Sequence, residues 1–222
     1  MPEFYEHFVN LVFIGIITLF PVVNPIGSAL MVSPFFEGLS NAHKRIVVWK
    51  ITLYAFLICT VSLFAGQYIL RIFGISIPVV QLAGGIMICK MGWEFLSADD
   101  KDHQESETPE LKDSAYSTIV NKIFYPITFP LSTGAGTISV IFTLSAHGAA
   151  MGSRDYYVNT GAILVSIVFI CLLIYIFYLN TKKMIHYLGT KGENIVNRIS
   201  AFLIFCVGLQ IGLSGLKALF KI

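Results

Sequence analysis

Long apolar segments alternate with shorter polar ones along this chain, and this pattern predicts its elements. An apolar stretch of roughly 18 or more residues is long enough to cross the hydrocarbon core of a bilayer as a helix. Six segments fit this description, and we predict a membrane helix in each: 8–36, 45–72, 76–96, 122–150, 157–181 and 195–219. The first and the fourth are longer than the roughly 20 residues that a straight span needs.

These two long segments carry proline and glycine where a membrane helix should be most regular. Phe20 to Ser28 read FPVVNPIGS, and Phe129 to Thr137 read FPLSTGAGT. Aligned at a constant offset, the two runs share the Phe-Pro pair, a glycine and a final hydroxyl residue. A break in a helix frees backbone groups that lipid cannot satisfy, so breaks persist only inside protein or beside a water-filled cavity. We therefore predict that each segment is two half-helices joined by unwound chain.

The one long polar stretch, residues 97–121, divides the chain into two halves. It holds seven acidic residues and little apolar content, so we expect a mobile linker without a core of its own. The predicted organisation is a three-helix repeat over 1–96, the acidic linker over 97–121 and a second three-helix repeat over 122–222. Because three crossings is an odd number, the two repeats must have opposite orientations. The predicted fold class is an all-α integral membrane protein with six transmembrane helices in two inverted-topology repeats.

Lysines and arginines predict the orientation, because they gather on the cytoplasmic side. The connections after the first, third and fifth segments carry eight of them, and the opposite face carries four. We therefore expect the linker in the cytoplasm and both termini on the outer side. The first set is Lys44, Arg45, Lys101, Lys112, Lys122, Lys182, Lys183 and Lys191, and the second is Arg71, Arg154, Lys217 and Lys221.

Composition supports a membrane protein and argues against several function classes. Hydrophobic residues make up 55% of the chain and charged residues 13%, whereas a soluble domain carries about 25% charge. The net charge of +2 is too small to suggest a nucleic-acid partner. The four cysteines lie in apolar segments without CxxC spacing, so we expect no metal or redox site. No HExxH motif, mid-span pair of aspartates or Ser/His/Lys constellation occurs, so we expect neither an enzyme nor a cofactor.

The two breaks are the candidate substrate site. A half-helix N-terminus offers N–H groups to a carboxylate, and a half-helix C-terminus offers carbonyls to an ammonium or a cation. Opposed breaks therefore suit a zwitterion such as an amino acid, while glycine lets the backbone approach it closely. The alternative is that proline and glycine only kink helices that pack tightly. The predicted substrate-binding residues are Asn24, Pro25, Gly27, Ser28, Ser132, Thr133, Gly134, Gly136 and Thr137.

Small residues on the third and sixth segments predict close helix packing rather than ligand contact. They are Gly84, Gly85 and Gly92 on the third segment, and Gly208, Gly212 and Gly215 on the sixth. Lys90 and Glu94 stand four residues apart, where they can pair or reach the membrane interface.

Several motifs resemble the MarC family of bacterial inner-membrane proteins, and together they cover nearly the whole chain. They are Asn24-Pro25-Ile26-Gly27 after Phe20-Pro21, Phe73 to Pro78, Ala83 to Ile86, and Pro130 with Gly134 to Ser139. The resemblance implies a multi-pass, six-helix inner-membrane protein built from inverted repeats, so that the expected outer side is the periplasm. Some members transport small neutral amino acids such as glycine and alanine, and others carry a multiple-antibiotic-resistance name. Ala135 stands where the family commonly has proline, and Gln81 stands where many members have arginine.

The leading hypothesis is a secondary transporter of small neutral amino acids that works by alternating access between the two halves. Its expected partners are the amino acid, the lipid bilayer and a coupling ion, for which H⁺ and Na⁺ are the candidates. A channel or a non-transporting membrane scaffold is the alternative, and a membrane-embedded enzyme is less favoured. Saturable uptake against a gradient indicates a transporter, and linear leak indicates a channel.

Overall fold

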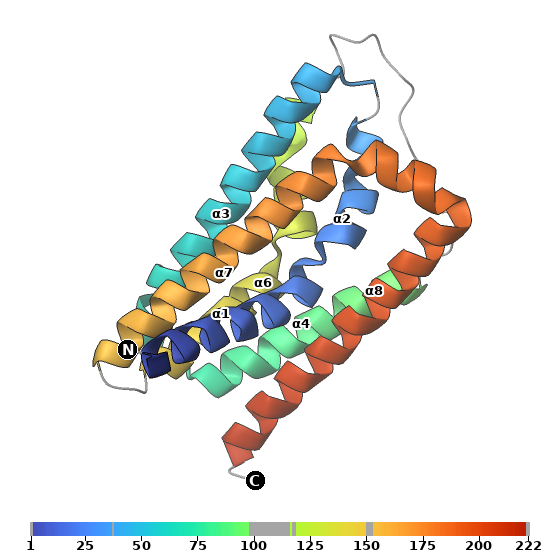
Figure 1. Cartoon of the computed structure of the whole chain (residues 1–222). Coiled ribbons are helices and arrows are strands. Elements are labelled where there is room, and N and C mark those ends of the chain that lie inside the picture. The colour runs from blue at the N-terminus through green and yellow to red at the C-terminus, as the bar shows by residue number, and fades with distance from the viewer. Residues whose placement is uncertain (1, 37, 98–115, 117–118, 150–152, 221–222) are drawn as a thin grey trace.

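A computed structural model of the chain describes residues 2–36, 38–97, 116, 119–149 and 153–220, and within these residues it is helical without a strand. Figure 1 shows an elongated bundle of long helices, with both termini toward the same end. The predicted linker lies mostly outside the described residues. The elements are α1 (Pro2–Val23), α2 (Pro25–Val32), the 3-10 helix η1 (Ser33–Phe36), α3 (Asn41–Ile72), α4 (Ile77–Ser97), the π-helix η3 (Ile123–Ser132), α6 (Ala135–Ala149), α7 (Ser153–Leu179) and α8 (Thr181–Phe220).

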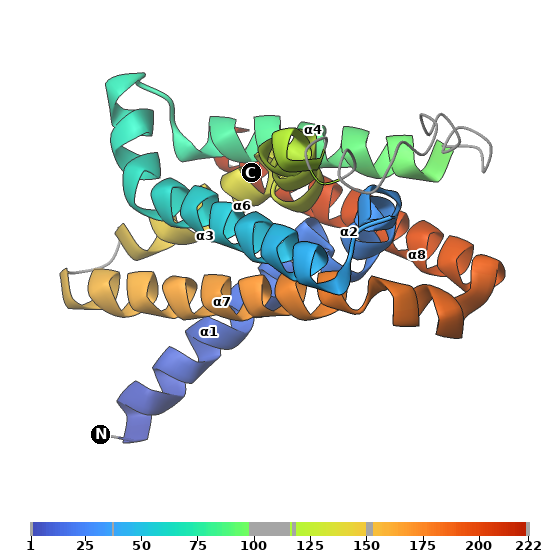
Figure 2. The ribbon, with the colours of Figure 1, turned by 90° about the horizontal axis from the view of Figure 1, so that it is seen from above.

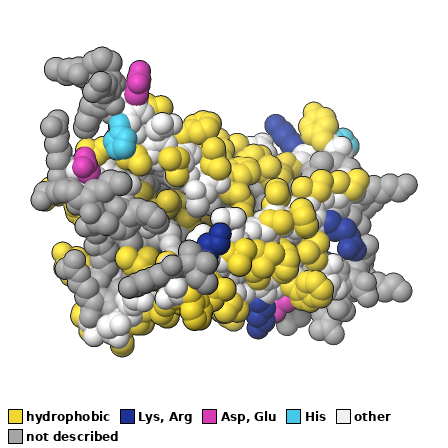
Figure 3. Space-filling model, turned by 90° about the horizontal axis from the view of Figure 1, so that it is seen from below, with side chains coloured by type: hydrophobic (Ala, Val, Ile, Leu, Met, Phe, Trp, Pro, Cys, Tyr) yellow, Lys and Arg dark blue, Asp and Glu magenta, His cyan; other side chains and the backbone are white. Residues whose placement is uncertain are grey.

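Within the described residues, four helical stretches are long and apolar enough to cross a membrane. They are Tyr5–Val32, Asn41–Gly66, Asp155–Leu179 and Ala201–Phe220. Their large apolar side chains also cover the outside of the bundle, where Phe13 is 63% exposed and Leu57 is 47% exposed. On the face in Figure 3, hydrophobic side chains cover most of the described surface and the charged ones are few. Such a surface is suited to lipid, since soluble monomers expose only small apolar patches.

Two of the six predicted spans are not among these four. The segment 76–96 forms α4, which carries Gln81, Lys90 and Glu94 among its apolar residues. Lys90 Nζ lies 3.7 Å from Glu94 Oε1, so the predicted pair forms on an exposed face. The segment 122–150 is interrupted in η3, and among its described residues Gly136–Ser145 forms a shorter apolar helix.

The two halves of the chain pack into one body. α4 lies along α8, α1 packs against α7, and α3 packs against α7 and α6. Seen from above in Figure 2, the first turns of α1 lead away from the bundle, and the rest of α1 joins it. Helices from both halves contribute to the buried core, which includes Leu19, Ile51, Ile88, Ile127, Ile141 and Ile174.

The α4–α8 contact is lined by the predicted glycines. A Cβ on Gly85 would lie 2.5 Å from Gly212 Cα, and one on Gly92 would lie 2.9 Å from Phe205 Cα. A Cβ on Gly215 would lie 2.6 Å from the Pro78 carbonyl oxygen. The start of α4 therefore meets the end of α8, so the pair is antiparallel with backbones in close contact.

Gly84 packs elsewhere. A Cβ there would clash with the Ser139 side chain of α6, and Ser139 Oγ donates a hydrogen bond of 3.1 Å to the Val80 carbonyl. This contact fixes α4 beside the helix that follows the second break.

Candidate functional site

The first helix break is one residue long. Asn24 separates α1 from α2 with φ 45° and ψ 61°, and it is the one described non-glycine residue with positive φ. Asparagine tolerates this left-handed conformation better than most residues. Asn24 Oδ1 accepts a hydrogen bond of 3.1 Å from Gly27 N, which caps the new helix. Pro25 follows at the first helical position, where its missing N–H costs nothing.

The second break is longer and is built differently. Within η3, Tyr125 (φ −123°, ψ 126°) and Phe129 (φ −117°, ψ 122°) are extended. Each directly precedes a proline, whose ring disfavours the helical conformation of the residue before it. The chain stays non-helical at Thr133 (φ −139°, ψ 94°), and α6 begins at Ala135. Thr133 is the residue that aligns with Asn24, so the two helices are interrupted at matching positions.

Hydroxyl groups of the second break bond carbonyls within the same segment. Three side chains donate to carbonyls five residues earlier: Thr128 to Ile123 at 2.7 Å, Ser132 to Ile127 at 2.7 Å and Thr133 to Thr128 at 3.2 Å. The Thr133 backbone N–H also donates to the Thr128 carbonyl at 2.8 Å. The break is thus supported from within its own segment.

Tyr178 of α7 joins the two breaks. It is fully buried, and its hydroxyl oxygen lies 2.7 Å from Ser132 Oγ. Ser132 has one hydrogen to donate, and the Ile127 carbonyl receives it, so Tyr178 is the donor in this pair. Ser28 Oγ of α2 lies near the Tyr178 hydroxyl, but it forms no hydrogen bond within the described residues. One phenol therefore faces a hydroxyl from each break.

The predicted site residues lie in or beside these breaks. Pro25, Gly27, Ser28, Ser132, Thr133 and Thr137 are buried, and Asn24, Gly134 and Gly136 are half-buried. Of these residues, Ser132 bonds the Tyr178 hydroxyl and Ser28 lies near it. Ligand contact by any of these residues stays a prediction.

Gly27 and Gly136 face protein atoms in this conformation. A Cβ on Gly27 would clash with the Asn24 amide, and one on Gly136 would lie 2.6 Å from Ile88 Cγ1 and 3.3 Å from Val22 Cγ1. Each glycine thus permits a close contact next to its break. The predicted approach of a ligand to their backbones requires these contacts to open.

Sequence reasoning missed two residues here. Tyr178 stands in an apolar helix far from both breaks in sequence. The one indication in the sequence is that a tyrosine buried in such a helix needs a hydrogen-bond partner for its hydroxyl. Lys44 was expected in a connecting loop, but it lies in the first turn of α3 and is 5% exposed. Its Nζ donates to the Leu179 carbonyl at 3.1 Å and to Thr181 Oγ1 at 2.6 Å. It thereby caps the C-terminal end of α7.

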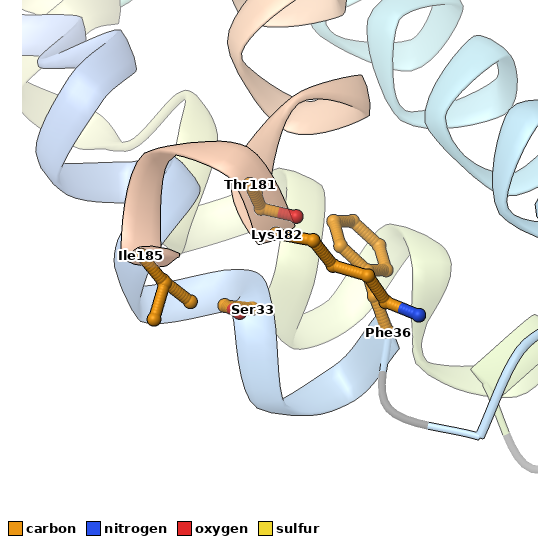
Figure 4. Close-up of a pocket in the computed structure, with 5 residues that line it drawn as sticks. All are labelled: Ser33, Phe36, Thr181, Lys182 and Ile185. Atoms are coloured by element: carbon orange, nitrogen blue, oxygen red, sulfur yellow. The ribbon is translucent and has the colours of Figure 1, made fainter. Parts of the chain in front are cut away.

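A cavity of about 210 Å³ lies next to this lysine. It is lined by Ser33, Phe36, Thr181, Lys182 and Ile185, so it is formed by η1 and the first turns of α8 (Figure 4). The Phe36 ring also contacts Tyr178, with ring centroids 6.2 Å apart. The Phe36–Tyr178 pair therefore lies between the cavity and the hydroxyls at the breaks.

Comparison with known proteins agrees with this membrane architecture. The sequence model of the MarC family integral membrane proteins matches residues 9–220. The inner membrane protein MarC of Salmonella typhimurium is 24% identical over 212 residues, which cover 94% of this chain and 95% of the relative. Those of Citrobacter koseri (25% over 215 residues) and Escherichia coli O1:K1 / APEC (24% over 212 residues) have the same coverage. No solved structure matches this chain. The chain is a multi-pass membrane protein and belongs to the MarC family.

Proposed function

We propose that this protein is a secondary transporter of small neutral amino acids and that the solute binds between the two helix breaks. The observation that carries the proposal is the convergence of both breaks on Tyr178, whose hydroxyl faces Ser132 and Ser28. Broken helices and hydroxyl clusters are costly in hydrocarbon, and membrane proteins keep them where they line a cavity or a solute path. Paired breaks in the two halves of a membrane chain point in particular to a transporter site.

The charge of the site favours a solute without net charge. Residues 8–36 and 123–149 contain no Asp, Glu, Lys or Arg. The site therefore offers hydroxyls, an amide and helix ends, which carry only partial charges. A zwitterion matches such a site, because its carboxylate suits a helix N-terminus and its ammonium suits free carbonyls.

The architecture that we propose for transport is six spans in two inverted repeats. In support, the breaks lie at aligned positions, α4 and α8 are antiparallel, and α3 packs against α7. In alternating access, α2 would move about Asn24 and α6 about η3. This movement would separate Ser28 from Ser132. We place both termini in the periplasm on the charge bias. A cysteine at Ser106 in a cysteine-free background should resist an impermeant thiol reagent in intact spheroplasts, and ready labelling would reverse this orientation.

Uptake by proteoliposomes tests the proposed function. Purified protein is reconstituted, and entry of labelled glycine or alanine is followed with and without imposed Na⁺ and H⁺ gradients. Saturable accumulation against the amino-acid gradient supports a transporter and identifies the coupling ion. Linear leak would indicate a channel, and the absence of flux would indicate a scaffold or an enzyme.

A further inference from the structure

The cavity beside Lys44 is well placed to be part of a solute path. η1 directly continues α2, the half-helix that begins at the first break. Thr181, on the opposite wall of the cavity, stands three residues after Tyr178. The elements that line the cavity, η1 and the start of α8, lie at the end of the bundle away from the termini (Figure 1).

Two aromatic rings separate this cavity from the hydroxyls of the breaks. Phe36 lines the cavity and is 1% exposed, and its ring meets Tyr178 at an interplanar angle of 60°. The Tyr178 hydroxyl then contacts Ser132. In the present arrangement the two rings lie in contact between the cavity and the Ser132 hydroxyl.

The walls of the cavity offer donors and positive charge. Lys182 lines the cavity, and its charge repels that of Lys44. Lys44 Nζ is held by neutral oxygens, and it lies 5.3 Å from the centroid of the Phe36 ring. Within the described residues neither lysine has a carboxylate partner. A buried ammonium without a counter-charge is unfavourable, so an anionic group beside it would be stabilised.

Thr181 bonds Lys44 and also lines the cavity. Its hydroxyl oxygen accepts the hydrogen bond from Lys44, which leaves its own hydrogen available to donate. Ser33 adds a second hydroxyl on the facing wall. A carboxylate accepts several such bonds at once, and charge-assisted bonds are the strong ones. The cavity is smaller than the roughly 300–1,000 Å³ of sites for drug-sized ligands, so it suits a small solute.

We propose that this cavity is the mouth of the solute path, where Lys182 and Thr181 hold the carboxylate of an amino acid. The Phe36–Tyr178 pair is the gate between this mouth and the two breaks. The proposal rests on the proposed transport function and adds to it a first binding step and a closing element. Lys44 is a positioning residue, because it acts through Thr181.

The carboxylate step is tested with two neighbouring lysines. Lys182→Gln and Lys183→Gln remove the same charge, and both side chains are exposed, but of the two only Lys182 lines the cavity. Lys182→Gln should raise KM for alanine uptake about three- to tenfold with little change in maximum rate, as expected for one partly exposed charge-assisted bond. Lys183→Gln should leave KM unchanged. An unchanged KM in Lys182→Gln, or equal increases in both variants, would overturn the carboxylate role.

The gate is tested without transport, so that its failure is distinct from failure of the proposed function. In a background without native cysteines, Ser28→Cys is treated with a small thiol reagent in detergent, with Phe36 intact or as Phe36→Ala. Removing the gate ring should speed labelling at position 28 about tenfold, since labelling follows the population of the open form. Ser166→Cys is the control, because Ser166 is buried against α1 on another face of α7 and bonds the Val12 carbonyl.

Two results would contradict the proposed role of Phe36 as a gate. One is equal labelling at position 28 with and without Phe36. The other is an equal rise at position 166, which would mean that Phe36→Ala only loosens the packing. If the wild-type protein takes up no amino acid but the gate result holds, the path exists and the proposed solute is wrong.

Discussion

The two helix breaks stand at aligned positions, yet they solve the same problem in different ways. The first turns at one residue, Asn24, whose left-handed backbone and single side-chain cap hold α1 and α2 together. The second extends over η3 and is supported by three hydroxyls that each bond a carbonyl five residues earlier. The first break therefore depends on one residue, whereas the second distributes its support.

This difference suggests different parts in a conformational change. A single left-handed residue between two regular helices has the form of a hinge, since few bonds must change when the helices swing. A segment with many local bonds can shift these bonds one after another, and π-type insertions of this kind occur often at functional sites. Tyr178 bonds Ser132 of the second break and lies near Ser28, which follows the first.

The largest expected effect is at the hinge. Asn24→Ala removes the cap and places alanine in a left-handed conformation, at a combined cost of about 2–3 kcal/mol. The thermal unfolding midpoint in detergent should fall by roughly 5–10 °C, at about 2–4 °C per kcal/mol for a chain of this size.

Asn24→Gly is the matched control. It also removes the cap, but glycine adopts positive φ without steric cost, so the midpoint should fall by only a fraction of that amount. If both variants lose the same stability, the left-handed backbone is not what makes the first break depend on Asn24.

The second effect in size is at the junction between the breaks. Ser132→Ala removes the hydroxyl that donates to the Ile127 carbonyl and accepts from the buried Tyr178 hydroxyl, at about 2 kcal/mol. Tyr178→Phe should cost about 1 kcal/mol, because it removes one bond and leaves no unpaired hydroxyl on α7. The double variant should cost less than the sum of the two, as expected for side chains in direct contact. Additive midpoint shifts would mean that the two hydroxyls do not act together.

The sequence predicted the place of both breaks but not their construction. The aligned Pro and Gly residues predicted interruptions around Asn24 and Thr133. They are informative because a broken helix is costly in lipid, so such residues are kept there only for a reason. The extended residues of η3 could also be predicted, because a residue before proline disfavours the helical conformation, and Tyr125 and Phe129 each precede a proline. Tyr178 could not be found in this way, since its partners come from distant segments. The burial of Lys44 likewise depends on the corner between α7 and α8.

A smaller effect should appear within the second break. Thr133→Val keeps the shape of the side chain and removes one hydroxyl, whose carbonyl partner also receives the Thr133 backbone N–H. The loss should be about 0.5–1 kcal/mol, near the net contribution of one hydrogen bond. A midpoint shift as large as that of Asn24→Ala would contradict the idea that support in the second break is distributed.

The smallest effect on stability should come from Ser28, which makes it the sharpest test of function. Its buried hydroxyl forms no hydrogen bond within the described residues, so Ser28→Ala removes a group that contributes little to the fold. The unfolding midpoint should stay within about 1 °C or rise slightly, because burial of an unpaired hydroxyl is unfavourable.

If that hydroxyl binds the amino acid once the Tyr178 junction opens, the same variant should raise KM for alanine uptake several-fold. Alanine should then also protect the variant less against heating than it protects the wild type, through mass action on the folded state. A stable variant with unchanged KM and unchanged protection would show that the meeting of the two breaks serves packing and not solute binding.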